Sequence, residues 1–232
     1  MRVNFQVGDG TVPNVGAILS GDIMNIFEQA GWETLILEEQ PAYGSAVPHT
    51  LSPNTIFYRA AALALADSGK GRKSNNLFRN LWNNESEFWE SNNYICQKEK
   101  LIHQHRFDIV RDALDPSRKK PMFSYIHLKE ETHDSINMPK LMDIDLVQLL
   151  NDLFDAGYLE NTFFFLMGDH GFRATKLITT PVGGIVNNMP GLIMIPPLGL
   201  LRDQPKLKDV LSSNALLVTS HWDLHRIAVE SF

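Results

Sequence analysis

Two residues with metal-binding side chains stand at the end of a long apolar run. Residues 162–171 read Thr-Phe-Phe-Phe-Leu-Met-Gly-Asp-His-Gly, so the run ends on Asp169 and His170. An apolar run without polar alternation is typical of a strand covered on both faces in a parallel sheet, and ligands gather at the carboxyl ends of such strands. Carboxylate and neutral imidazole both bind a zinc-like ion, and Gly171 would let the backbone turn sharply beside them. A plain strand followed by a polar turn, with Asp169 as a cap, explains the segment equally well.

Two other expected strands end on residues that could do chemistry. A strand at 3–7 runs into a turn, after which Thr11 opens a helix. A hydroxyl there is often only an N-cap, but a nucleophile would gain from the helix dipole and from amides that bind an oxyanion. A strand at 121–128 leads into an acidic loop that contains His133, and a solvated loop is the usual explanation of such a cluster. The three strand ends together carry the groups that a metal-assisted hydrolase needs.

The elements that would position these residues alternate between strand and helix. Further strands are expected at 34–37 and 191–195, with a glycine-bearing loop before the second of them. One or two short helices are expected at 15–27, ended near Gly31, and other helices at 60–66, 98–114, 139–156, with Gly157 as its stop, and within 216–232. Proline-rich residues 40–53 are expected to form a loop, and Asn-rich residues 67–95 an irregular surface excursion. This order predicts an α/β fold with a largely parallel central sheet flanked by helices. We expect residues 1–232 to form a single domain.

Composition and charge exclude several classes of protein. The chain has 232 residues, 44% of them hydrophobic, with a formal net charge of −6. Its acidic balance argues against a nucleic-acid partner. No segment reads as a membrane span or a signal peptide, and the single cysteine, Cys96, excludes a disulfide within the chain.

Five short segments carry a family resemblance. They are Thr11-Val-Pro-Asn14, Gly31-Trp-Glu-Thr34 followed by Glu38-Glu39, Thr132-His133-Asp134 with Asn137, Gly157-Tyr-Leu-Glu-Asn-Thr162, and Gly168-Asp-His-Gly-Phe-Arg173. Their order resembles the alkaline phosphatase superfamily, and more closely its sulfatase-like branch of uncharacterised animal proteins. Members of that branch are typically secreted or membrane-anchored, so the resemblance implies an extracellular or membrane-associated location. It covers the chain from about residue 4 to Pro197, and residues 217–225 resemble the closing helix of that branch.

The resemblance also implies roles for individual residues. Thr11 stands where relatives place a metal-bound nucleophile, Asp169 and His170 match the ligand pair of one metal, and His133 matches a ligand of a second. The implied cofactor is a divalent metal, zinc first and calcium or magnesium as alternatives. The implied substrate is a small anionic phosphate or sulfate ester, and Arg173 is either an anion clamp or an ordinary surface arginine.

The departures from the family pattern leave two hypotheses open. The superfamily begins with a central strand that ends in a metal-binding Asp. This chain starts after that point, so we expect an N-terminally truncated member that lacks the first central strand. Lys129 stands where two-metal relatives carry another Asp. His221 and His225 are candidates for the final imidazole ligand, although helix-face packing or solvent exposure explains either residue more simply. The chain is therefore either a hydrolase of phosphate or sulfate esters, or a non-catalytic member that serves as a binding or interaction module.

Overall fold

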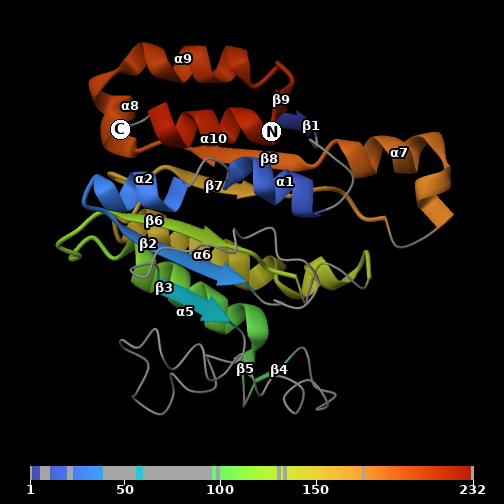
Figure 1. Ribbon diagram of the computed structural model, residues 1–232, viewed down its shortest axis with the longest axis horizontal. Coiled ribbons are helices and arrows are strands. Elements are labelled where there is room, and N and C mark those ends of the chain that lie inside the picture. Colours follow the sequence, from blue (N-terminus) through green and yellow to red (C-terminus); the bar gives the residue numbers. More distant parts are fainter. Residues whose placement is uncertain are drawn as a thin grey trace.

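The strands of this computed structural model form three small sheets (Figure 1). The structure describes residues 2–5, 11–19, 23–38, 56–59, 96–97, 100–129, 132, 135–173 and 176–230. Its strands are β1 (Arg2–Phe5), β2 (Glu33–Glu38), β3 (Ile56–Arg59), β4 (Cys96–Gln97), β5 (Lys100–Leu101), β6 (Met122–Ile126), β7 (Phe164–Met167), β8 (Gly191–Ile195) and β9 (Thr219–Ser220). The sheet orders are β7-β8-β1-β9, β3-β2-β6 and β4-β5.

The expected α/β class is confirmed, but the described strands do not form one large parallel sheet. Strands β3, β2 and β6 pair in parallel. In the four-stranded sheet, β8 runs antiparallel to both of its neighbours, β7 and β1. The reason lies in the connection between β7 and β8. It returns to the edge at which β7 ended, where the Gly168 amide donates to the Gly191 carbonyl at 3.0 Å, whereas a parallel neighbour requires a crossover to the opposite edge.

Helices account for most of the remaining described chain. They are α1 (Thr11–Ile18), α2 (Ile23–Gln29), α5 (Ile102–Leu114), α6 (Asp143–Asp155), α7 (Pro181–Asn188), α8 (Leu198–Asp203), α9 (Pro205–Asn214) and α10 (His221–Glu230), with 3-10 turns η2 (Met138–Leu141) and η3 (Lys176–Thr179). Left-handed glycines follow α2 and α6, at Gly31 (φ 89°) and Gly157 (φ 76°). Both helices therefore end where the sequence predicted.

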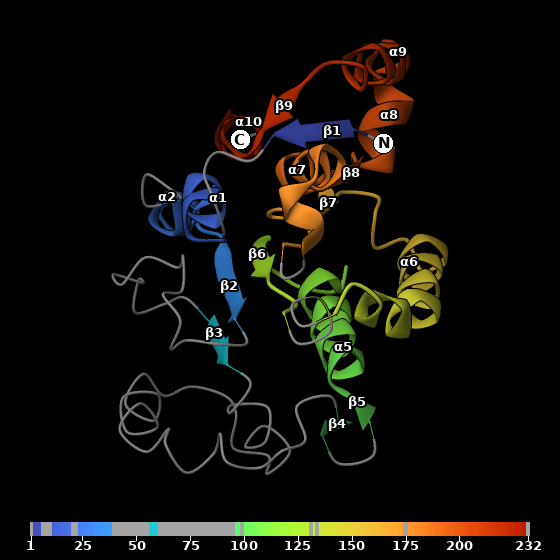
Figure 2. The same ribbon diagram turned by 90° about the vertical axis from the view of Figure 1, so that its right-hand side faces the viewer.

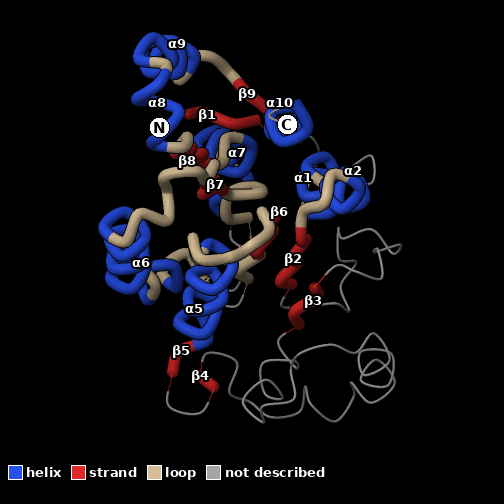
Figure 3. The backbone as a smooth tube through the Cα atoms, turned by 90° about the vertical axis from the view of Figure 1, so that its left-hand side faces the viewer, coloured by secondary structure: helices blue, strands red, loops and turns tan. Residues whose placement is uncertain are grey.

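Helices cover both faces of the strands. One hydrophobic cluster joins α1, α2 and α10 to β2, β6 and β7, through residues such as Phe27, Phe123 and Met167. A second cluster joins α5 and α6 to β6, β7 and β8, through residues such as Leu153, Ile126 and Phe164. Figures 2 and 3 show β2 and β6 between the α1–α2 pair and the α5–α6 pair. Because β6 and β7 contribute to both clusters, the two sheets share one core.

Several expectations lie outside the described residues or need correction. The loop at 40–53, the helix at 60–66 and the excursion at 67–95 fall outside the part of the chain that the structure describes. Strand β7 is only partly buried, because it lies at the edge of its sheet and not at the centre. Within the described segments, no helix combines the length and apolar character that a membrane crossing requires.

Candidate active site

The carboxyl ends of three strands meet at one edge of the four-stranded sheet. Strands β7 and β1 both run antiparallel to β8, and β9 runs parallel to β1. Consequently β1, β7 and β9 share one direction and end on the same edge. Asp169 and His170 follow β7 at this edge, α1 begins at Thr11 after β1, and His221 opens α10 directly after β9. In Figure 1 the arrows of β6 and β7 also point to the same side of the molecule.

Asp169 and His170 converge on a common point. The Oδ2 atom of Asp169 lies 3.5 Å from the Nε2 atom of His170, and the side chains are 22% and 13% exposed, respectively. Both groups are therefore shielded from bulk water but still reachable from it. Direct sequence neighbours usually point apart, so a pair that converges in this way is a candidate for binding one small cation.

The other imidazole nitrogen of His170 fixes the orientation of the ring. The Nδ1 atom lies 2.7 Å from the Gly171 carbonyl oxygen. A carbonyl oxygen can only accept a hydrogen bond, so Nδ1 carries the hydrogen. In the neutral form of this ring, the lone pair of Nε2 would face the Asp169 carboxylate. Two acceptor atoms at this separation repel each other unless a proton or a metal ion lies between them, and metal-binding histidines commonly donate their second nitrogen to a carbonyl in this way.

Contacts from distant segments hold the backbone on both sides of this pair. The fully buried His221 ring donates from Nε2 to the Gly168 carbonyl oxygen at 3.2 Å. On the other side, the Gly171 amide donates to the Asn187 carbonyl oxygen at 2.9 Å. Helices α10 and α7 therefore fix the residues immediately before and after Asp169 and His170.

Gly171 is required by close approach. A Cβ atom on this residue would lie 1.9 Å from the Val186 carbonyl oxygen. Its φ is not among the positive values of the described glycines, which are found at Gly31 and Gly157. The expectation that Gly171 serves a sharp turn is thus replaced by a packing role, in which the last turn of α7 lies against the strand end.

The two histidines of α10 are held by backbone carbonyls. His221 Nε2 donates to Gly168, as described above, and His225 Nδ1 donates to the Ile18 carbonyl oxygen at 2.9 Å. The Ile18 carbonyl is at the carboxyl end of α1, where a hydrogen bond from a histidine stabilises the helix. Each of these contacts engages one of the two ring nitrogens and holds a backbone segment. The sequence placed His221 as a ligand candidate, because a contact across 53 positions leaves no local pattern.

Of the remaining predicted site residues, some lie within the described part of the chain and one lies outside it. His133 lies outside the described residues, whereas Thr11 is the first residue of α1. Arg173 is exposed and Lys129 is partly buried. In the part of the chain that the structure describes, no group of three or more His, Cys, Asp or Glu side chains could hold a metal ion.

Helix α7 contributes a further polar residue beside the site. Asn187 is only 6% exposed, and its Oδ1 atom has no hydrogen-bond partner within the described segments. A buried amide oxygen without a partner is costly. Asn187 belongs to the segment that contacts Gly171, so its amide is an additional polar group beside the candidate site.

One family profile matches the chain, over residues 76–227, and its description is "Protein of unknown function (DUF229)". The chain belongs to this family. The match covers the end of β7, Asp169, His170 and the helix α7 that packs against them. No curated protein and no solved structure matches the chain.

Proposed function

We propose that this DUF229 member is a metal-dependent hydrolase domain that cleaves phosphate or sulfate esters. Thr11 would act as the nucleophile, and Asp169 and His170, together with His133, would hold a divalent metal. The observation that carries the proposal is the 3.5 Å separation of Asp169 Oδ2 and His170 Nε2, with the imidazole oriented by the Gly171 carbonyl.

The donor pair fits zinc. At zinc bond lengths of about 2.0–2.2 Å and a tetrahedral angle, two ligand atoms lie about 3.4 Å apart. The observed separation is 3.5 Å. Two donors fill half of a tetrahedral shell, so at least one further protein ligand has to come from segments such as 130–134. A bound divalent ion would lower the pKa of a coordinated hydroxyl and neutralise charge on the ester oxygens.

The protein side chains and helix ends would supply the nucleophile, bind the substrate anion and position Asp169. Thr11 begins a helix whose N-terminal amides and dipole favour an anionic group. The Thr11 oxygen would bond to phosphorus or sulfur as the bond to the ester oxygen breaks, with the Thr11 proton passing to solvent and the departing alkoxide taking a proton from solvent. Water would then hydrolyse the Thr11 ester, which releases phosphate or sulfate and restores the hydroxyl. Arg173 is exposed and could contact the substrate anion only from the open side of the site. His221 would hold the Gly168 backbone and thereby the direction of Asp169.

The resemblance to the alkaline phosphatase superfamily also implies how the two sheets are related. We propose that the four-stranded and three-stranded sheets are parts of one alkaline-phosphatase-like central layer, extended in relatives by the first central strand. The shared hydrophobic clusters on both faces support this arrangement.

A second candidate function is a non-catalytic binding or interaction module. Lys129 favours it, because this partly buried cation at the end of β6 stands where two-metal relatives carry a ligand. An ammonium group there would repel a nearby metal ion. A module of this kind would keep the strand-end geometry and lack turnover.

Elemental analysis after dialysis tests both candidates. The wild-type protein should retain stoichiometric zinc, and Asp169→Asn should weaken zinc binding by more than the 10–100-fold typical of losing an outer-shell partner. Asp155→Asn, which changes an exposed carboxylate on α6, is the matched control. Absence of zinc in the wild type would refute the metal site.

Turnover of nitrophenyl phosphate and sulfate esters separates the two candidates. The hydrolase proposal requires turnover that Thr11→Ala abolishes while zinc is retained. Zinc binding without turnover in the wild type would assign the chain to the second candidate. Undiminished turnover in Thr11→Ala would return Thr11 to the role of a helix cap.

A further inference from the structure

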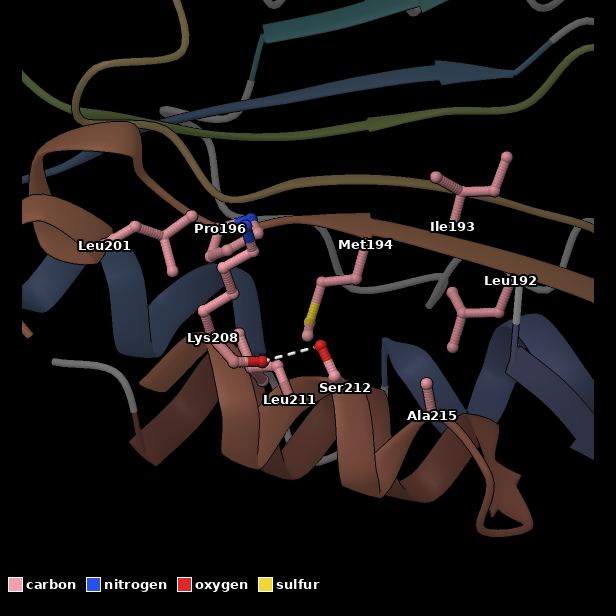
Figure 4. Close-up of a pocket in the computed structure, with 9 residues that line it drawn as sticks. All are labelled: Leu192, Ile193, Met194, Pro196, Leu201, Lys208, Leu211, Ser212 and Ala215. Atoms are coloured by element: carbon pink, nitrogen blue, oxygen red, sulfur yellow. Dashed lines mark hydrogen bonds between the residues drawn. The ribbon is translucent and has the colours of Figure 1, made fainter. Parts of the chain in front are cut away.

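A cleft of about 270 Å³ lies between strand β8 and helix α9, away from the strand-end residues described above. Figure 4 shows Leu192 and Met194 of β8 facing the helix, whereas Ile193 points to the opposite side. Leu211 and Ala215 face the strand from α9 and the residue that follows it. The walls are thus mostly apolar, and the space between them is not filled by side chains of the described segments.

Helix α9 is poorly packed for an amphipathic helix. Its apolar residues Leu207, Val210 and Leu211 recur at helical spacing, yet none of its residues is buried. A surface helix normally obtains its stability by burying such a stripe against the core. The apolar side of α9 therefore faces a partly open cleft, and a ligand in that cleft would complete its packing.

Charge in the cleft is confined to one end. Lys208 is the single charged residue among the described residues that line it. In Figure 4 the Lys208 nitrogen lies beside Pro196, at the opposite end from Leu192 and Ala215. Lys208 and Ala215 are seven positions apart, which corresponds to about 10 Å along a helix axis. The cleft is thus elongated, with a cation at one end and apolar walls along the rest.

We propose that this cleft binds a medium-chain alkyl carboxylate, with the carboxylate at Lys208 and the alkyl chain against Leu192, Met194 and Leu211. The cationic end favours an anionic head group, and the elongated apolar walls favour a hydrocarbon chain. A volume of about 270 Å³ is close to the lower limit of small-molecule pockets and too small for a protein helix. The proposal is independent of the hydrolase activity proposed above.

Methyl NMR of the methionines, with sodium decanoate as the probe, tests the proposal. Decanoate should shift the Met194 methyl signal in a saturable way, with a Kd of about 1 mM or tighter, as ordinary ligand efficiencies give for this size. Met24 is buried in the hydrophobic cluster that joins α1, α2 and α10 to β2, β6 and β7, away from the cleft, so its signal should not move. Octanoate should bind about fifteenfold more weakly, because it lacks two methylenes and each methylene transferred from water contributes about fourfold.

Three variants and a cationic probe locate the binding mode. Lys208→Gln should weaken decanoate binding about fivefold, as expected for a partly exposed ion pair, whereas Lys206→Gln on the same helix should not. Ala215→Phe should fill the cleft and abolish the Met194 shift. Decyltrimethylammonium, with the same chain and opposite charge, should bind less well than decanoate.

Three results would overturn the proposal. The first is a Met194 signal that decanoate does not move. The second is equal binding of decanoate and decyltrimethylammonium together with no effect of Lys208→Gln. The third is a dimer that Ala215→Phe dissociates without decanoate uptake, which would assign the cleft to a second copy of the chain.

Discussion

Replacing Gly171 by alanine should separate helix α7 from the end of strand β7. The added Cβ atom would lie 1.9 Å from the Val186 carbonyl oxygen and 2.9 Å from the Asn187 Cα atom. Both obstacles are backbone, so the last turn of α7 has to move by about 1 Å or more. Overpacking of this kind costs about 1–3 kcal/mol, and loss of the Gly171–Asn187 hydrogen bond adds about 0.5–1.5 kcal/mol. We expect the free energy of unfolding to fall by about 2–4 kcal/mol.

Two glycines of α7 provide matched controls for this change. A Cβ atom on Gly183 would lie 1.8 Å from the Leu177 carbonyl oxygen, so Gly183→Ala should also destabilise the protein. Gly184 has no atom within 4 Å of the same position, and Gly184→Ala should stabilise the helix by about 0.5–1 kcal/mol. Gly183→Ala and Gly184→Ala make the same substitution in the same helix, and only the surroundings of the added Cβ atom differ.

Urea unfolding, followed by circular dichroism, measures these free energies. Amide hydrogen exchange at Gly171 reports the loss of its bond to Asn187 even where α7 detaches locally without global unfolding. A Gly171→Ala protein with wild-type stability and a still protected Gly171 amide would refute the close packing of α7 against the site.

Two further predictions concern α6. Leu153→Ala should reduce the free energy of unfolding by about 2–5 kcal/mol in urea titrations, because Leu153 is fully buried; Phe154→Ala should cost much less, since Phe154 is 59% exposed, and equal losses would contradict the packing of α6. The pKa of Asp145 lies below its ordinary value, chiefly because its carboxylate accepts a hydrogen bond from His103. A carboxyl group with a lowered folded pKa stabilises the protein above its ordinary pKa of about 3.9, and this contribution is lost as the pH falls through the folded value. Stability below about pH 4 should therefore fall less steeply in Asp145→Asn than in the wild type, and identical slopes in urea titrations over pH would argue against the His103 contact.

Local patterns in the sequence predicted most of the long elements. The apolar positions of α5, the left-handed glycine after α6 and the apolar run of β8 all gave elements close to those observed. Whether a strand runs parallel or antiparallel to its neighbours could not be predicted from such local patterns. The residues of β8 would suit a parallel or an antiparallel strand equally, and its direction is set by a connection that returns to the edge at which β7 ends.

Elements with weak local signals were missed. The segment of α7 contains Pro181, Gly183 and Gly184, which favour a loop, and the sequence predicted one. In the structure Thr180 caps the helix by accepting from the Gly183 amide, and Pro181 occupies its first turn. The apolar pattern of α6 does not identify its buried face, because this helix carries apolar residues on two faces: Ile144 is 81% exposed, whereas Leu149 and Leu153 are buried.

In the candidate site, too, contacts between neighbouring residues could be predicted from the sequence, whereas contacts between distant segments could not. Asp169 and His170 follow one another, so their proximity could be expected, and the structure adds that their donor atoms converge. The contacts that hold them, from His221 and Asn187, connect segments far apart in the chain. No pattern within a single segment could have indicated these two residues as its supports.

The strands β1, β7 and β9 end on one edge, and this supports the candidate site independently of any family resemblance. Strand directions alone bring the start of α1 and the Asp169–His170 pair to the same edge. The number of ligands is a stricter requirement. Two donors cannot retain zinc through dialysis against a competing solvent, so stoichiometric zinc would require at least one more protein ligand. Because no third donor clusters with the pair within the described segments, that ligand would have to come from outside them. His133 is then the first candidate, and loss of zinc in His133→Ala would identify it.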